Sequence, residues 1–69
     1  MNYNKMTNWE ILFELEENLL CFGYKLLRRE HEEVIQDIRD TQPKDLYKYA
    51  QSLINQTLEE EYICVYSIR

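Results

Sequence analysis

The apolar residues between positions 8 and 40 recur at intervals of three and four, which is the spacing of one helix face. The first series consists of Leu12, Leu15, Leu19, Phe22 and Leu26. The second series takes over after residue 27 and consists of Leu20, Leu27, His31, Val34 and Ile38. The pattern predicts one long helix from about residue 8 to about residue 40, about 50 Å long at 1.5 Å per residue.

The start of this helix has its own local signal. Thr7 and Glu10 have the spacing of a capping box, in which each side chain accepts a hydrogen bond from the other residue's backbone N–H. Met6 and Ile11 occupy the two positions of a hydrophobic staple around the same turn. We therefore expect a helix that begins near residue 8.

Gly23 is the one residue where this helix can bend or break. As the left-handed residue of a Schellman cap it would end the helix, with Tyr24 touching Leu19 across it. As an interior residue it would cost only about 1 kcal/mol, which tertiary burial outweighs. No Ser, Thr, Asp or Asn follows closely to cap a new helix, and the apolar spacing continues in phase. These observations favour a continuous helix, bent at Gly23 at most.

The segment from Asp40 to Pro43 predicts a turn, because proline cannot continue a helix but suits the first turn of the next. We expect a second helix over residues 43–60, antiparallel to the first because the connection is short. Its apolar side would consist of Leu46, Ala50, Leu53, Ile54 and Leu58.

Residues 61–68 allow two interpretations. Their β-branched and aromatic residues are typical of a strand. Leu58, Tyr62 and Val65 nevertheless continue the helical spacing. A lone strand has no partner in an otherwise helical chain, so we favour helix, unless the tails of two chains pair edge to edge.

The aromatic content bears on assembly. Six tyrosines, two phenylalanines and one tryptophan are more than a two-helix hairpin can bury, and tyrosine is enriched at protein interfaces. Short chains also need additional support for their cores. We predict an all-α fold with one domain over residues 1–69, pairing into a dimeric helical bundle. A tight three-helix monomer is the alternative.

Charge and cysteine content limit the classes of function and the cellular compartment that we expect. Eight basic and 13 acidic residues give a net charge of −5, which argues against direct binding to nucleic acid or to an anionic membrane. The basic group Lys25, Arg28 and Arg29 is outnumbered by the acids around it. No apolar run approaches the ~20 residues of a membrane span, and the first residues have no apolar signal core. Two cysteines are no disulfide framework, so we expect a cytoplasmic protein with Cys21 and Cys64 buried.

Catalytic and metal motifs are incomplete. His31 and Glu32 begin like the zinc motif H-E-x-x-H, but position 35 is isoleucine and the chain has no second histidine. Neither a glycine-rich phosphate loop nor a nucleophile with a base at recognisable spacing is present. We therefore expect no metal, no cofactor and no enzyme activity.

The carboxylates are the one patterned feature, with one group on a helix face near the start and another along residues 30–40. The candidate partner-binding residues are Trp9, Glu10, Glu14, Glu17, Glu30, Glu33, Asp37 and Asp40. They predict a small acidic regulator or inhibitor, of the kind that phages and mobile elements encode, docking on a larger basic protein such as one that binds nucleic acid. A plain solvated surface is the ordinary interpretation of such charges. The alternative function is a structural homodimer or assembly subunit.

Overall fold

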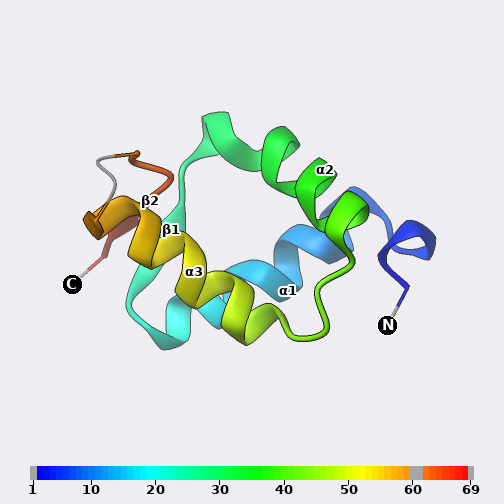
Figure 1. Ribbon diagram of the computed structural model, residues 1–69, viewed down its shortest axis with the longest axis horizontal. Helices are drawn as coiled ribbons and strands as arrows, with labels where there is room; N and C mark the ends of the chain where they lie inside the picture. The colour runs from blue at the N-terminus through cyan, green and yellow to red at the C-terminus, as the bar shows by residue number, and fades with distance from the viewer. Residues whose placement is uncertain (1, 60–61, 69) are drawn as a thin grey trace.

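A computed structural model of the chain describes residues 2–59 and 62–68. Within these residues it contains three α-helices, α1 (Asn8–Cys21), α2 (His31–Thr41) and α3 (Leu46–Glu59). Two short strands, β1 (Tyr24–Leu26) and β2 (Val65–Ser67), form a sheet, and η1 (Tyr3–Lys5) and η2 (Arg28–Glu30) are single 3-10 turns (Figure 1). The mainly helical class is confirmed, but the sheet makes the all-α description incomplete.

Helix α1 begins where its local signal predicts. The Thr7 hydroxyl oxygen accepts a hydrogen bond from the Glu10 N–H at 3.2 Å, and the Glu10 carboxylate accepts one from the Thr7 N–H at 2.9 Å. Both halves of the capping box are therefore present, and a helix start near residue 8 is confirmed.

Gly23 ends α1, so the expectation of one helix over residues 8–40 is wrong. Its φ of 82° lies in the left-handed region, and its N–H donates to the Leu20 carbonyl at 2.9 Å. This bond closes the last turn as a Schellman cap does. The longest extent of the molecule is 32 Å, well short of the ~50 Å that a continuous helix would need.

The chain that leaves Gly23 forms β1, which pairs antiparallel with β2. The register places Lys25 opposite Tyr66 and Leu26 opposite Val65, and the Ile68 N–H donates to the Gly23 carbonyl at 3.0 Å. The helical interpretation of the C-terminal segment is therefore wrong for its described residues 62–68. The break at residue 23 supplies the strand partner that a continuous helix would have removed. Residues 60 and 61, where the second helix was expected to end and this segment to begin, lie outside the described residues.

Helix α2 follows η2 without any side-chain cap, and it ends at Gln42, whose φ of 46° is left-handed. Helix α3 begins at Leu46 and not at Pro43, which stays in the loop. Asp45 acts as its N-cap, because its carboxylate accepts a hydrogen bond from the Tyr47 N–H at 2.8 Å. The second predicted helix is thus confirmed over residues 46–59, with a later start than expected.

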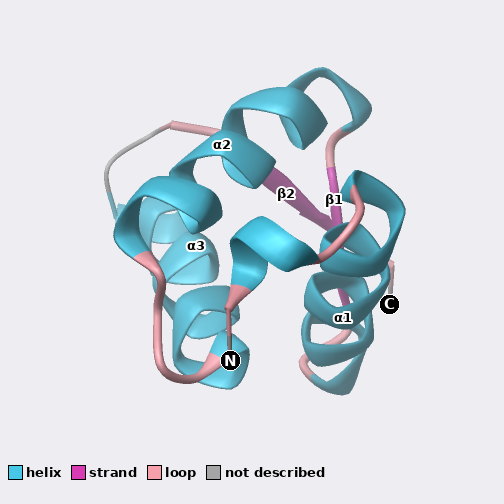
Figure 2. Ribbon diagram, turned by 90° about the vertical axis from the view of Figure 1, so that its right-hand side faces the viewer, coloured by secondary structure: helices cyan, strands magenta, loops and turns pink. Residues whose placement is uncertain are grey.

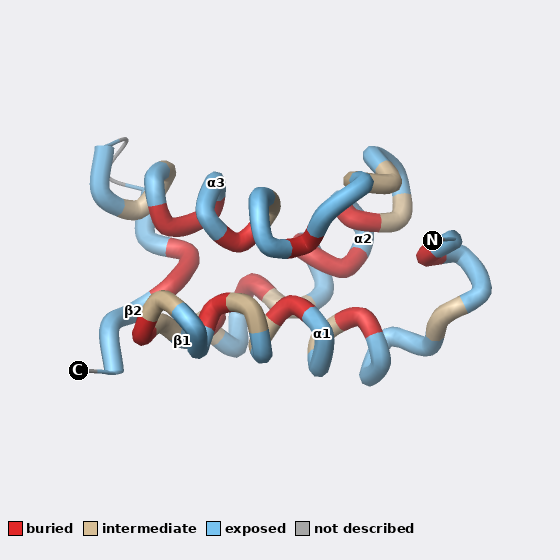
Figure 3. The backbone as a smooth tube through the Cα atoms, turned by 90° about the horizontal axis from the view of Figure 1, so that it is seen from below, coloured by how far each residue is buried: buried red, intermediate tan, exposed pale blue. Residues whose placement is uncertain are grey.

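The core lies between the three helices and the inner face of the sheet (Figure 2). Figure 3 shows the buried positions of α1 and α3 facing each other, with the exposed positions of α1 on the side away from α3. The buried apolar residues are Tyr3, Ile11, Leu15, Leu19, Leu26, Val34, Ile35, Ile38, Leu46, Ala50, Leu53, Ile54, Cys64 and Val65. The described part of the chain thus surrounds its core with three helices where the sequence predicted two, while dimerisation itself stays a prediction.

The N-terminal turn η1 is fastened to the corner between α2 and α3. Tyr3 is buried, and its hydroxyl donates to the Pro43 carbonyl at 2.8 Å. The Arg39 guanidinium donates to the carbonyls of Tyr3 and Met6, both at 2.9 Å. Arg39 therefore joins α2 to the N-terminal segment through backbone carbonyls.

Gly23→Ala tests the break in α1. Alanine at a left-handed φ costs about 1–2 kcal/mol, so we expect the free energy of unfolding to fall by about that amount. In a continuous helix the same change would raise it by about 1 kcal/mol. Urea denaturation followed by circular dichroism measures the sign.

Asn55→Ala, at an exposed position inside α3, is the control for helix propensity. It should leave stability unchanged or raise it by up to about 0.7 kcal/mol. A Gly23→Ala variant that is stabilised like the control would show that residue 23 lies inside a helix.

Candidate functional site

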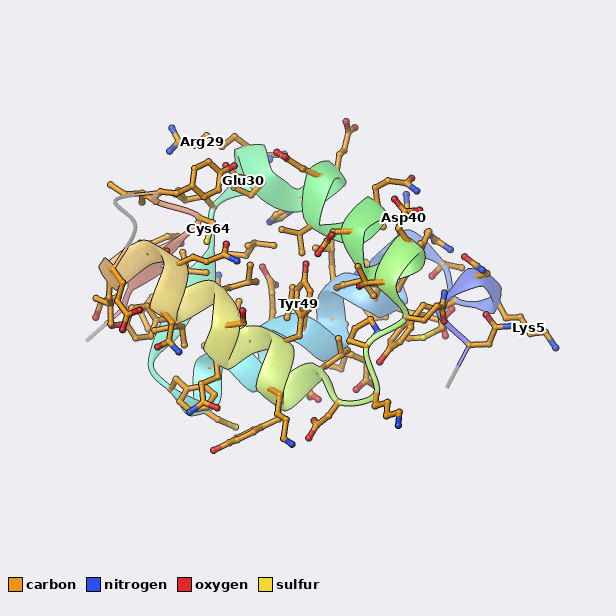
Figure 4. The ribbon with its side chains drawn as sticks, in the orientation of Figure 1. Lys5, Arg29, Glu30, Asp40, Tyr49 and Cys64 are labelled. Carbon is orange, nitrogen blue, oxygen red and sulfur yellow. The ribbon has the colours of Figure 1, made fainter. Side chains whose placement is uncertain are left out.

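A cleft of about 330 Å³ lies between α2 and α3. One wall comes from η2 and α2 and the other from α3, while the segment before β2 closes one end (Figure 4). Its apolar floor includes Val34, Leu53 and Cys64, all buried. The polar lining consists of Glu30, Glu33, Asp37, Tyr49, Ser52, Gln56 and Tyr62.

Glu30 closes the end of the cleft next to the C-terminal segment. It is only 6% exposed, and the Tyr62 hydroxyl donates to its carboxylate, 2.8 and 3.0 Å from the two oxygens. The Arg29 Nε lies 3.8 Å from the same carboxylate. A buried carboxylate needs such donors, because losing hydration is costly for the ionised form. The hydrogen bond to Glu30, followed by desolvation and the negative charge nearby, raises the pKa of Tyr62 to about 12.

Tyr49 bridges the middle of the cleft. It points from α3 toward α2 in Figure 4, and its hydroxyl donates to the Asp37 carboxylate at 2.5 Å. Burial raises the pKa of Tyr49 well above its ordinary value, and the hydrogen bond to Asp37 adds to that shift. Both tyrosines therefore remain neutral donors, and both carboxylates that they hold remain acceptors.

Glu33, on α2, lies between Glu30 and Asp37 in the sequence. It is exposed, and its side chain has no hydrogen bond or ion pair with any other described residue. Asp40, the last of the four predicted acids, does not line the cleft and accepts a hydrogen bond from Gln36 at 2.9 Å. The four predicted acids of residues 30–40 are thus divided: three line the cleft, one of them, Glu30, as a buried group, and Asp40 lies outside it.

The two cysteines differ in their exposure to water. Cys64 is buried as expected, with its Sγ 3.3 Å from the Leu53 carbonyl and 3.3 Å from the Thr57 hydroxyl. Cys21 is exposed at the end of α1, so the expectation that it is buried is wrong. Among residues 2–59 and 62–68, no three His, Cys, Asp or Glu side chains come close enough to hold one metal ion.

A second region with functional potential is the outer face of α1, formed by Trp9, Phe13 and Leu20. These side chains are 69%, 47% and 47% exposed, and their spacing of four and seven places them on one side of the helix. The Trp9 and Phe13 rings stack with their centroids 5.2 Å apart and their planes 17° apart. The outer face therefore carries a stripe of three apolar side chains in contact with water, with Glu16 between Phe13 and Leu20 on the same side of the helix.

Carboxylates accompany this stripe. Glu10, Glu14 and Glu17 are exposed on α1, and the helix contains no lysine or arginine. The Thr7 backbone N–H and hydroxyl lower the pKa of the Glu10 carboxyl below its usual value, which keeps it ionised. The predicted residues on α1 thus lie together near Trp9, but they belong to a different surface from the α2–α3 cleft.

Sequence reasoning missed the α3 and C-terminal half of the cleft. The number of tyrosines was noted but was attributed to interfaces. The bond from Tyr62 to Glu30 joins residues 32 positions apart, and the bond from Tyr49 to Asp37 joins neighbouring helices. No local spacing signals either pair.

Comparisons with models of known protein families, with curated protein sequences and with solved structures find no match to this chain. None of the helices in the described part of the chain has the length and apolar content needed to cross a membrane.

Tyr62→Phe tests the bond that holds Glu30. We expect a lower free energy of unfolding at neutral pH, because the buried carboxylate loses its hydroxyl donor. The pKa of Tyr62 is raised to about 12 in the folded chain, so the unfolded chain releases this proton first as the pH rises. The stability from this group is therefore complete below about pH 10 and is lost as the pH rises through about 12.

The stability difference between the wild type and Tyr62→Phe should consequently shrink between pH 10 and pH 12. Tyr47→Phe is the matched control, because Tyr47 and Tyr62 are both 47% exposed. The Tyr47 hydroxyl makes no hydrogen bond with the described residues, so its loss should change little at any pH. Equal effects of the two variants in denaturant titrations would contradict the role of the Tyr62–Glu30 bond.

Proposed function

We propose that this chain is a small acidic protein-binding module, a regulator or inhibitor without chemistry of its own, that docks on a basic surface of a larger protein. The observation that carries the proposal is the exposed stack of Trp9 on Phe13, with Leu20 in line and carboxylates alongside. Tryptophan is enriched among the residues that dominate binding energy at protein interfaces.

The exposure of the α1 outer face has no explanation in the fold itself. Trp9 leaves most of its surface in water, while the opposite side of α1 supplies Ile11, Leu15 and Leu19 to the core. Contiguous apolar side chains with a polar border are typical of interaction surfaces. A partner that covers this face would remove the stripe from water.

Charge favours a basic partner over a second copy of the chain. The carboxylates beside the stripe have no basic residue on the same helix, so two copies meeting through α1 would bring like charges together. A partner with lysine or arginine around an apolar patch would match the face and be steered toward it. Covering such a patch, for example on a nucleic-acid-binding protein, would block the partner's own ligand.

Leu20→Ser tests this docking face, with Leu58→Ser as the matched control. Both leucines are exposed, at 47% and 66%, but only Leu20 lies on the α1 outer face. The chain is immobilised and exposed to an extract of cells from its source organism. The proteins that it retains are then identified and purified. Each is then titrated against the chain with the fluorescence of Trp9, its only tryptophan, as the readout.

For a true partner we expect a blue shift of Trp9 emission and an affinity that falls as salt is raised, because charge steers the encounter. Leu20→Ser should weaken binding by about tenfold. Leu58→Ser should bind like the wild type. Equal affinities of the two variants, or an affinity that salt leaves unchanged, would contradict docking through α1.

The second candidate function is a homodimer or assembly subunit, and the C-terminal segment is the observation that favours it. Ile63, Tyr66 and Ile68 are 53%, 44% and 48% exposed around the two-stranded sheet. Lys25 lies opposite Tyr66 in this sheet, so the surface is less acidic than α1.

This second hypothesis predicts a mass of twice the 8.5 kDa chain in light scattering at micromolar concentration, unaffected by salt. Ile68→Ser should return the mass to 8.5 kDa, whereas Leu20→Ser should not. A wild-type mass of 8.5 kDa at all concentrations would exclude the homodimer.

A further inference from the structure

We infer that the cleft between α2 and α3 binds a linear alkylammonium group, with the ammonium between Glu33 and Asp37 and the methylene stem over Val34 and Leu53. This site is separate from the α1 outer face and does not depend on the proposed docking function. The inference rests on the size of the cleft, on its apolar floor and on the state of its three carboxylates.

The shape of the cleft suits a narrow, partly apolar ligand. Its volume of about 330 Å³ lies at the lower end of the ~300–1,000 Å³ of small-molecule sites. The floor is built from Val34 and Leu53, which are 5% and 6% exposed. Methylene groups placed there would leave water, which favours binding in proportion to the apolar area that is buried.

The three carboxylates of the cleft differ in the hydrogen-bond donors and cations that they already contact. The Tyr62 hydroxyl donates to Glu30, within 3.0 Å of both carboxylate oxygens, and the Arg29 Nε lies 3.8 Å away, so Glu30 already has a donor and a cation beside it. Asp37 accepts one hydrogen bond, from Tyr49, which holds the carboxylate in place but carries no positive charge. Glu33 has no such partner among the described residues. The end of the cleft at residues 33 and 37 is therefore the more negative one.

Residues 33 and 37 are four apart on α2, which places their Cβ atoms about 5–6 Å from each other. Two like charges at this spacing repel each other and destabilise a helix. An ammonium has three N–H donors and no acceptor, so one ammonium can donate to both carboxylates at once. Binding would thus relieve the repulsion and form charge-assisted hydrogen bonds.

The polar side chains of α3 opposite these acids favour the same ligand. Tyr49 is committed as a donor to Asp37, while Ser52 and Gln56 line the α3 wall with groups that can also accept. An ammonium placed against α2 would therefore meet acceptors on both walls. The same chemistry is offered by a free diamine and by a lysine side chain of another protein.

The test is a chemical-shift titration of the full ¹⁵N-labelled chain with three probes: 1,5-diaminopentane, Nα-acetyl-lysine amide and 1-pentanol. We expect saturable shifts at Val34, Leu53 and Gln56 with one or both amines, and none with the neutral alcohol at the same concentration. Tighter binding of the diamine would identify a free amine as the ligand. Tighter binding of the lysine derivative would identify a protein side chain.

Glu33→Gln and Glu17→Gln form the matched pair of variants, because each removes one negative charge from an exposed glutamate on a helix. In the Glu33→Gln variant, the loss of one charge-assisted hydrogen bond should weaken amine binding about tenfold. Glu17→Gln, on α1, should bind like the wild type. Glu33→Gln relieves repulsion on α2, so we expect no loss of folding, which the same spectra report.

Three results would overturn the inference. Equal weakening by the two variants would show that amines respond only to the net charge of the chain. Equal shifts with the alcohol would show an apolar site without a role for the carboxylates. The absence of saturable shifts with both amines would exclude an alkylammonium site in this cleft.

Discussion

The left-handed turn at Gly23 determines the arrangement of every element after α1. With φ at 82°, the chain leaves the helix after residue 22 and becomes free to run as β1. Glycine takes this conformation without the steric cost that a Cβ would add. Because the turn places β1 beside α1, strand β2 finds a partner, and α2 can return toward the start of the chain (Figure 1). A helix running through residue 23 would allow neither arrangement.

The same return of the chain builds the α2–α3 cleft. Pairing of β2 with β1 brings Tyr62 and Cys64 beside η2, where the Tyr62 hydroxyl reaches the buried Glu30 carboxylate. A buried acid is tolerated only with donors of this kind, so the position of the C-terminal segment and the burial of Glu30 depend on each other. The cleft is therefore a consequence of the strand pairing and of the tyrosines that accompany it.

Local signals in the sequence were sufficient for the start of α1 and for most of α3, but not for the break after α1 or for the two strands. The capping box at Thr7 and the apolar spacing in residues 46–59 predicted two helices, because both effects act over one or two turns. The break at Gly23 was recognised as an alternative and rejected, since α2 begins without a side-chain cap and thus without the usual start signal. Once the break was missed, the strand at residues 65–67 lacked a partner and was assigned to a helix.

The candidate site residues also fall into those that local spacing predicted and those that depend on distant contacts. Trp9 and the α1 carboxylates were found from spacing along one helix, and the structure keeps them on that helix. Glu30 looks identical to Glu33 in the sequence, and only the distant Tyr62 makes it an interior group. Tertiary contacts over tens of residues determine which acids remain available to a ligand, and helical spacing contains no information about them.

Two of the eight basic residues that contribute to the net charge of −5, Arg29 and Arg39, hold segments of the chain together. Arg39 donates to backbone carbonyls of the N-terminal segment, and the Arg29 guanidinium donates to the Ile63 carbonyl while it approaches Glu30. Both cations stabilise the path of the chain, and among the described residues neither forms an ion pair with Glu33 or with a carboxylate of α1. Two surfaces have exposed carboxylates beside apolar side chains: the α1 outer face, with Trp9 stacked on Phe13, and the cleft, with a narrow apolar floor. The first exposes an aromatic stack and the second has a narrow apolar floor, which is why we propose a protein partner for the one and an alkylammonium group for the other.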